Sequence, residues 1–203
     1  MKRTHLWAGL TATAVATTVV SGVLLLPKWD TKPGSLTATP DPSLDAVLRK
    51  GIKQGEAGDL AGAAKTFRKV LDLDAGNKLA WYNLGVIAQY DARTADALAA
   101  YDKALKADPK YTPALYNKAI LLEPSDTDQA IAILRRVVVA NPKAATAYLH
   151  LGQNLVKKNR DSEAEDAFVS AVRVDPSLRR LIPQPFRDSV RSGTTTTDSR
   201  PGG

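Results

Sequence analysis

Residues that could perform nucleophilic or acid–base chemistry are few in this sequence of 203 residues. It contains two histidines and no cysteine, which excludes disulfides, thiolate zinc sites and cysteine nucleophiles. A catalytic triad needs a histidine near its nucleophile, but His5 stands close to the N-terminus and His150 has no second residue at a metal-binding or base-pair spacing. No glycine-rich phosphate loop leads into a lysine followed by serine or threonine. We therefore expect no catalytic residues, no metal, no cofactor and no enzymatic activity.

The formal net charge of +7 would suit nucleic-acid binding if it were concentrated on a folded surface. Residues 44–176, however, contain 19 basic and 17 acidic side chains, whereas residues 1–43 contain 4 and 2, and residues 177–203 contain 5 and 2. Because the excess lies in the two ends of the chain, we expect no nucleic-acid partner. Apolar residues make up 44% of the sequence, enough for one packed domain with appendages.

The middle of the chain repeats a pattern of small, apolar and proline residues at intervals of 33 or 34 positions. Its clearest copy contains Trp81, Leu84, Gly85, Ala88, Ala97, Tyr101, Ala104 and Pro109. The preceding copy contains Gly51, Ala63, Phe67 and Val70, and the two that follow contain Leu115, Ala119, Ala130, Leu134, Val137 and Pro142, then Tyr148, Leu151, Gly152, Leu155, Ala164, Phe168, Ala171 and Pro176. A unit of this length cannot bury its apolar face alone, so consecutive copies predict stacked pairs of helices.

The small residues of this pattern have a physical role in packing two helices together. Glycine or alanine at positions 51, 85, 119 and 152 would let the first helix of each pair approach the second closely, and an alanine at 63, 97, 130 and 164 would face it. Larger residues such as Phe67, Tyr101 and Phe168 would fill the grooves beside this contact. A proline ends the second helix because it cannot continue the preceding hydrogen-bond ladder.

This pattern resembles the tetratricopeptide repeat (TPR), a helix–turn–helix unit of roughly 34 residues. The resemblance covers residues 44–176 and implies an all-α fold, a right-handed α-solenoid. Its four units would be 44–77, 78–111, 112–144 and 145–178. We expect a short cap at 177–192, because a solenoid needs its last hairpin covered, followed by a disordered tail at 193–203.

Polar residues, glycines and prolines predict where individual helices begin and end. We expect the first helix to start near a cap at Ser43 and to end before Gly58, and Asp59 to cap the second helix. Further caps are expected at Ser125, three residues ahead of Asp128, and at Asp161 or Ser162, with Asn159 in a left-handed conformation. In the C-terminal cap, a helical turn with Leu178, Leu181 and Ile182 should stop at Pro183 and Pro185, and a second short helix with Phe186 should reach Val190.

An uncharged run of 21 residues, from Leu6 to Leu26, follows the basic residues at the N-terminus. As a helix it would extend roughly 31 Å, which matches the hydrocarbon core of a bilayer, and Trp7 and Trp29 stand at its two ends, where indole rings favour the interface. We expect an uncleaved signal-anchor, a transmembrane helix at 6–26, after a short tail at 1–5. Residues 27–43, with several prolines and threonines, would form a tether to the repeats. The alternative is a cleaved secretory signal with a small-residue site at 12–14 or 14–16.

The very short N-terminal tail favours an orientation with the N-terminus in the cytoplasm and the repeats outside the cell membrane of a bacterium. The opposite orientation, with the repeats in the cytosol, is the one that TPR receptors of the mitochondrial outer membrane have. Small residues at four-residue spacing, Gly9, Thr13, Thr17 and Ser21, would also allow the anchor to self-associate.

In TPR proteins the first helices of the units form the inner wall of the solenoid, so the resemblance implies a partner-binding groove there. Helical spacing selects the side chains expected to be exposed on that wall. They are Leu48, Ile52, Leu79, Tyr82, Asn83, Val86 and Tyr90 in the first two units, and Tyr116, Asn117, Ile120, Leu149, His150 and Gln153 in the last two. Asn83 and Asn117 occupy equivalent positions in successive units, so we expect their amides to lie side by side and to suit the backbone of an extended peptide.

The composition of this wall bears on the class of partner. Chaperone-binding TPR domains hold two carboxylates with lysine, asparagine and arginine, whereas here Leu48, Ile52, Tyr82 and Val86 occupy the corresponding positions. We therefore expect a non-catalytic scaffold or adaptor, in envelope assembly or quality control, that binds a peptide or helix of a partner protein. The alternatives are a module for a non-protein envelope ligand, a glycan or a lipid, and a cytosol-facing TPR receptor or adaptor.

Overall fold

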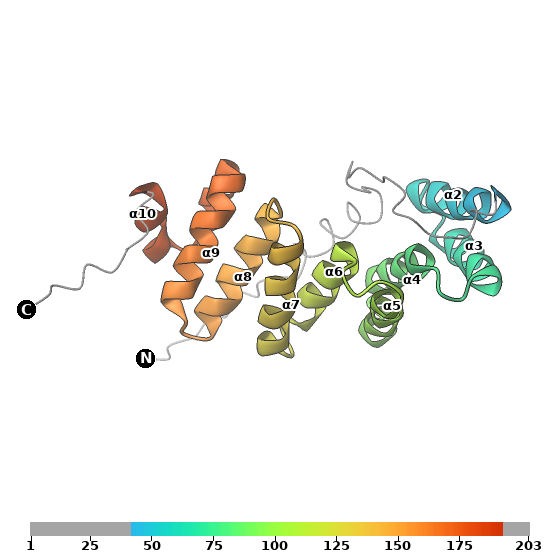
Figure 1. Ribbon diagram of the computed structural model, residues 1–203, viewed down its shortest axis with the longest axis horizontal. Helices are drawn as coiled ribbons and strands as arrows, with labels where there is room; N and C mark the ends of the chain where they lie inside the picture. The colour runs from blue at the N-terminus through green and yellow to red at the C-terminus, as the bar shows by residue number, and fades with distance from the viewer. Residues whose placement is uncertain (1–41, 193–203) are drawn as a thin grey trace, which may run out of the picture. The chain divides into compact units, whose positions relative to one another are not determined.

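The computed structural model describes residues 42–192, and every regular element in this range is helical (Figure 1). The helices are α2 Pro42–Glu56, α3 Leu60–Leu73, α4 Lys78–Tyr90, α5 Thr94–Ala107, α6 Thr112–Leu122, α7 Thr127–Ala140, α8 Ala145–Lys157, α9 Asp161–Val174, the 3-10 helix η1 Pro176–Leu181, and α10 Gln184–Ser192. The prediction of an all-α helical repeat is confirmed for this range. The chain divides after Ala97 into two compact units, which we call the N-terminal and the C-terminal unit, and each is described by itself.

The helices in this range are short, and none of those between residues 42 and 192 is long and apolar enough to cross a membrane. The longest, α2, has 15 residues. The predicted anchor at 6–26, most of the tether at 27–43 and the tail at 193–203 lie outside the described residues, so these assignments stay predictions.

The N-terminal unit consists of α2, α3, α4 and the first turn of α5. Its core contains buried side chains from the first three of these helices, namely Leu48, Ala63, Ala64, Phe67, Val70, Ala80 and Ile87. Gly51 of α2 lies directly against Phe67 of α3, because a Cβ atom built on the glycine would be 2.8 Å from Cε1 of the ring. The prediction that a small residue at this position lets the two helices approach closely is confirmed.

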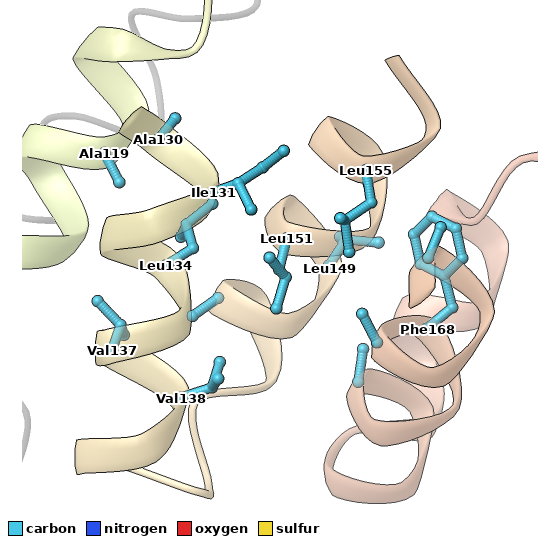
Figure 2. Packing of buried hydrophobic residues seen from close by; sticks show 14 of the residues in the cluster. Ala119, Ala130, Ile131, Leu134, Val137, Val138, Leu149, Leu151, Leu155 and Phe168 are labelled. Carbon is cyan, nitrogen blue, oxygen red and sulfur yellow. The ribbon is translucent and has the colours of Figure 1, made fainter. Parts of the chain in front are cut away.

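The C-terminal unit comprises the rest of α5, helices α6 to α10, and a larger core (Figure 2). Side chains of α7, α8 and α9 dominate this core, among them Ile131, Leu134, Val137, Leu151, Leu155 and Phe168. Gly152 of α8 has the role of Gly51, since a Cβ atom on it would come within 3.0 Å of three atoms of the Phe168 ring. Ala130 and Ala164, which were predicted to face the small residues from the second helices, are fully buried.

Two of the predicted helix-end residues have the expected role. The Asp59 side chain accepts a hydrogen bond of 2.8 Å from the Gly62 amide and so caps α3. Asn159, between α8 and α9, has a φ of 55°, in the left-handed region that asparagine tolerates better than most residues. Ala92, between α4 and α5, has a φ of 57°. Gly58, between α2 and α3, also has a positive φ, of 80°. The same kind of turn is therefore used three times within residues 42–192, and only the copy at Ala92 could not be recognised from its residue type.

Two other helix starts correct the sequence-based assignment. Helix α2 begins at Pro42, so Ser43 lies inside the helix instead of capping it. Proline suits a first helical position because its missing N–H would have no partner there. Helix α9 begins at Asp161, and Arg160 occupies the cap position without a side-chain hydrogen bond to the helix. The predicted caps at Asp161 or Ser162 are therefore wrong, and Asp161 instead places a carboxylate near the positive end of the helix dipole.

The start of α7 is shifted by one residue from the expected cap at Ser125. The Asp126 side chain accepts a hydrogen bond of 3.0 Å from the Gln129 amide, which makes Asp126 the cap. The Ser125 amide still donates to the Leu122 carbonyl and closes the end of α6. The Asp126 amide donates to the same carbonyl at 2.7 Å, but the Asp126 carbonyl accepts from the Ala130 amide and so begins the hydrogen-bond ladder of α7.

The last hairpin is covered by η1 and α10, close to the predicted cap helices. Leu178 and Ile182 are buried there, and the Phe186 ring packs on the Phe168 ring of α9 with centroids 5.3 Å apart. Pro185 lies in the first turn of α10 and does not stop a helix. Leu181 was expected to help form the cap but is 51% exposed.

Candidate functional site

In the N-terminal unit, the predicted wall residues come from α2 and α4, and most of their side chains are less accessible than expected. Leu48, Tyr82, Asn83 and Val86 are buried. Leu48 belongs to the core formed with α3, and the Asn83 amide donates a hydrogen bond of 2.7 Å to the Leu79 carbonyl of its own helix. The expectation that these four side chains are exposed is therefore corrected.

The other predicted residues of this unit retain some accessible surface. Ile52 and Leu79 are half-buried against the core cluster. Tyr90, at the end of α4, is 52% exposed. A role of these seven residues in partner binding stays a prediction.

In the C-terminal unit, the predicted wall residues come from α6 and α8, and most of them are half-buried. They are Tyr116, Asn117, Ile120, His150 and Gln153. Leu149 is the exception, because it is 4% exposed and belongs to the core of this unit. Leu149 is therefore not exposed on the wall, contrary to the prediction. Since Asn83 and Asn117 lie in different units, the side-by-side placement of their amides stays a prediction.

The Asn117 side chain is held by α5, the helix that precedes α6. Its Nδ2 donates a hydrogen bond of 3.3 Å to the hydroxyl of Tyr101 on α5. Tyr101 is fully buried. The amide is therefore positioned by a neighbouring helix instead of being only solvated.

Glu123, the residue that ends α6, connects this helix to α8 through a polar network. Its Oε1 accepts hydrogen bonds from Nδ1 of His150 and from Nδ2 of Asn154, both at 2.8 Å. The Asn154 amide also donates to the His150 carbonyl at 2.8 Å, and its Oδ1 lies 3.5 Å from Nζ of Lys157. Asn154 has no exposed surface. The network therefore joins the α6–α7 hairpin to the α8–α9 hairpin with groups that are shielded from water.

The Glu123 carboxyl is ionised at neutral pH in this setting. Its side chain is only 16% exposed, and burial by itself would raise its pKa. The hydrogen bond and charge of His150, with smaller contributions from Asn154 and Lys157, outweigh burial and hold the pKa below its usual value. A charged carboxylate is thus fixed in one orientation on the surface shared by α6 and α8.

An aromatic side chain borders this carboxylate network. The Tyr116 ring stands edge-on to the His150 ring, with centroids 5.8 Å apart and an interplanar angle of 82°. Burial raises the pKa of the Tyr116 hydroxyl, so the tyrosine stays neutral. The site thus offers an apolar ring beside a charged oxygen.

Two residues of this site, Glu123 and Asn154, were absent from the predicted wall. Glu123 follows Tyr116 by seven positions and therefore lies on the same helical stripe. Asn154 follows His150 by four positions, which places it one turn further along α8. Extending the α6 stripe by one turn would have found Glu123, whereas Asn154 lies beside Gln153 on the buried edge of the α8 stripe.

The helical pairs described above match a known family. A family model for the tetratricopeptide repeat matches residues 48–112 and 120–178, more than half of the chain. The chain belongs to the tetratricopeptide repeat family. A TPR domain generally serves as a protein–protein interaction module.

Known proteins that resemble this TPR chain include a long human relative and two solved structures. Human Protein O-mannosyl-transferase TMTC3 is 29% identical over 125 residues, which covers 59% of this chain and 14% of that protein, so the chain spans a small part of that relative's length. The crystal structure of MamA has 23% identity and a TM-score of 0.61 and covers 70% of this chain and 89% of its own. The structure of pilF from Pseudomonas aeruginosa has 22% identity and a TM-score of 0.62, and the match covers 70% of this chain and 65% of the pilF chain. The two structures show the TPR fold.

Proposed function

We propose that this TPR chain is a membrane-anchored, non-catalytic interaction module that binds a peptide or helix of a partner protein on the first helices of its repeats. The observation that carries the proposal is the surface shared by α6 and α8. There a fixed carboxylate, a histidine, an aromatic ring and the half-buried Ile120 and Gln153 are brought together. Surfaces that combine rigid aromatic groups with positioned polar groups are typical of peptide recognition.

The membrane part of the proposal depends on the uncharged run at 6–26. An N-terminal anchor with the repeats on the extracytoplasmic side of a bacterial membrane would place the TPR domain where envelope proteins assemble. Protease treatment of intact cells tests this orientation, because repeats outside the cytoplasm would be digested and repeats in the cytosol would be protected. Release of the chain from membranes by high salt would contradict the anchor itself.

The binding role is best tested by site-specific photo-crosslinking in the native cell. A photoreactive amino acid at Gln153, on the proposed surface, should crosslink to one protein partner. The same substitution at Ala132, an exposed position on α7, serves as the matched control. Crosslinks from Gln153 to lipid or glycan would indicate that the surface binds a non-protein ligand and not a protein partner. An equal set of products at both positions would show that the α6–α8 surface is not the binding site.

A further inference from the structure

The surface of α6 and α8 carries its polar groups in two stripes that run along neighbouring helices. Tyr116, Ile120 and Glu123 follow one another at four and three residues on α6, which places them on one face. His150 and Gln153 stand on the facing stripe of α8, and the contacts of His150 with both Tyr116 and Glu123 show that the two stripes meet.

The two oxygens of the Glu123 carboxylate differ in what they contact. Oε1 accepts both hydrogen bonds of the network, from His150 and from Asn154. Oε2 has no hydrogen bond to any of the residues that the structure describes, and no buried side-chain oxygen in that part of the chain lacks a partner. Solvent therefore reaches Oε2, while Oε1 is used to fix the direction in which Oε2 points.

The lysines of α6 and of the turn after α8 have partners of their own. Lys118 is paired with Asp102 at 2.5 Å, and Lys158 is paired with Asp128 at 2.8 Å. Nζ of Lys157 lies 3.5 Å from the side-chain oxygen Oδ1 of Asn154. Within residues 42–192 no ion pair joins Lys157 to Glu123. The imidazole of His150 is in direct contact with the carboxylate, through the other oxygen.

We propose that Glu123 is the anchor for an arginine or lysine side chain of the partner peptide, which donates to Oε2 while its aliphatic part lies along Tyr116 and Ile120. This assignment rests on the proposed function and names the chemistry that the binding surface selects. A partly buried, ionised carboxylate gives a stronger hydrogen bond to a cation than an exposed one, because less water competes. The ring and the isoleucine suit the apolar stem of either basic side chain.

An acidic partner fits this surface less well. A carboxylate docked at the same place would meet Glu123 at close range, and like charges in a site with little water are strongly unfavourable. Its favourable contact would be with Lys157, whose side chain is exposed and whose Nζ already lies 3.5 Å from Oδ1 of Asn154. The position of charge thus selects for a basic residue in the partner.

Selection of peptides on the full-length chain tests the inference. A displayed library of random 12-residue peptides is selected against the detergent-solubilised wild type, Glu123→Gln and Glu165→Gln. The last variant removes one negative charge on α9 as a matched control. We expect wild type and Glu165→Gln to enrich peptides that share an arginine or lysine next to apolar residues, and Glu123→Gln to lose this preference.

The affinity of one enriched peptide then gives the magnitude. Glu123→Gln should weaken its binding at least about tenfold, and replacing the basic residue of the peptide by glutamine should weaken binding to the wild type by a similar factor. The glutamine still offers an oxygen to His150 and Asn154 but presents an amide in place of Oε2. Circular dichroism at neutral pH should therefore show an unchanged helical signal, with the melting temperature lowered only by the loss of the Glu123 charge. The peptide variant keeps the comparison decisive even if the protein variant is unstable.

Each other outcome overturns a defined part of the argument. Enriched peptides that share an acidic residue or no charged residue, or that bind Glu123→Gln as tightly as the wild type, would refute the basic anchor while leaving a peptide-binding TPR surface in place. Failure to enrich any peptide would refute the anchor and the proposed function together.

Discussion

The close contact between Gly152 and Phe168 makes a quantitative prediction about stability. A Cβ atom added at Gly152 would come within 3.0 Å of Cε1, Cδ1 and Cζ of the ring, distances that real side chains do not adopt. Phe168 is fully buried and also packs against Phe186. The ring edge would have to move by about 1 Å in a packed core, a kind of overpacking that typically costs about 1–3 kcal/mol.

The substitution Gly152→Ala also has a favourable effect that must be subtracted. Alanine is about 1 kcal/mol better than glycine inside a helix, so the net loss of unfolding free energy should be about 0–2 kcal/mol. Gly51→Ala should cost less, because its Cβ atom would lie 2.8 Å from the nearest atom of Phe67 and 3.1 Å from the next two. Gly76→Ala, whose Cβ atom would have an ordinary contact of 3.4 Å with Asp74, serves as the control and should be nearly neutral.

Urea denaturation followed by circular dichroism measures these differences, and a double-mutant cycle identifies their cause. In a Phe168→Leu background the aromatic ring is gone, so Gly152→Ala should cost at least about 1 kcal/mol less than it does in the wild type. Equal costs in the two backgrounds would refute the contact as the source of the effect. A stabilisation of about 1 kcal/mol by Gly152→Ala alone would show that the helices are not packed closely at this position.

Three further predictions concern helix ends and the polar network. Asp59→Ala should lower the unfolding free energy by about 0.5–2 kcal/mol by removing the cap of α3, whereas Asp59→Asn should change it little; equal effects in urea denaturation would contradict the capping role. Ala92→Gly should be neutral or stabilise by up to about 1 kcal/mol, because glycine relieves the left-handed backbone at this turn, and a clear loss in the same assay would refute that reading. The folded protein holds the pKa of Glu123 below its unfolded-state pKa of about 4.5, so the charged carboxylate stabilises the fold above that pH. This stabilisation is lost as the pH falls through the folded-state pKa. Glu123→Gln should therefore make the melting temperature less dependent on pH in the acid range. An unchanged pH profile would show that the network does not hold the carboxylate.

The packing of the helical pairs could be predicted from the sequence because every pair solves the same problem. Gly51 and Gly152 recur at the same place in the pattern, and each receives a phenylalanine ring from the next helix. Caps were predicted less well, since several polar residues follow one another in each turn. At the start of α7, for example, Asp126 and not Ser125 is the cap, because its carbonyl accepts the hydrogen bond of the Ala130 amide that opens the helix.

The accessible part of the predicted wall was harder to obtain from spacing. Helical periodicity gives the direction in which a side chain points but not how far neighbouring helices cover it. Leu48 and Leu149 occupy equivalent positions on their helices, and both were expected to be exposed, yet both belong to the core of their unit. Periodicity alone therefore overestimates the width of the exposed stripe.

The polar network escaped prediction because it departs from the repeat. Asn154 corresponds to Leu121 in the preceding pair and to Ile87 in the pair before that. Glu123 corresponds to Gln89 in the preceding pair and to Val156 in the following pair. A search for recurring residues discards such single substitutions, although a fully buried asparagine is tolerated in a core only if its hydrogen bonds are satisfied. Here they are satisfied by Glu123 and by the His150 carbonyl. Residues that serve packing repeat from pair to pair, whereas the residues of this network occur in one pair only, so a pattern built from the repeat does not contain them.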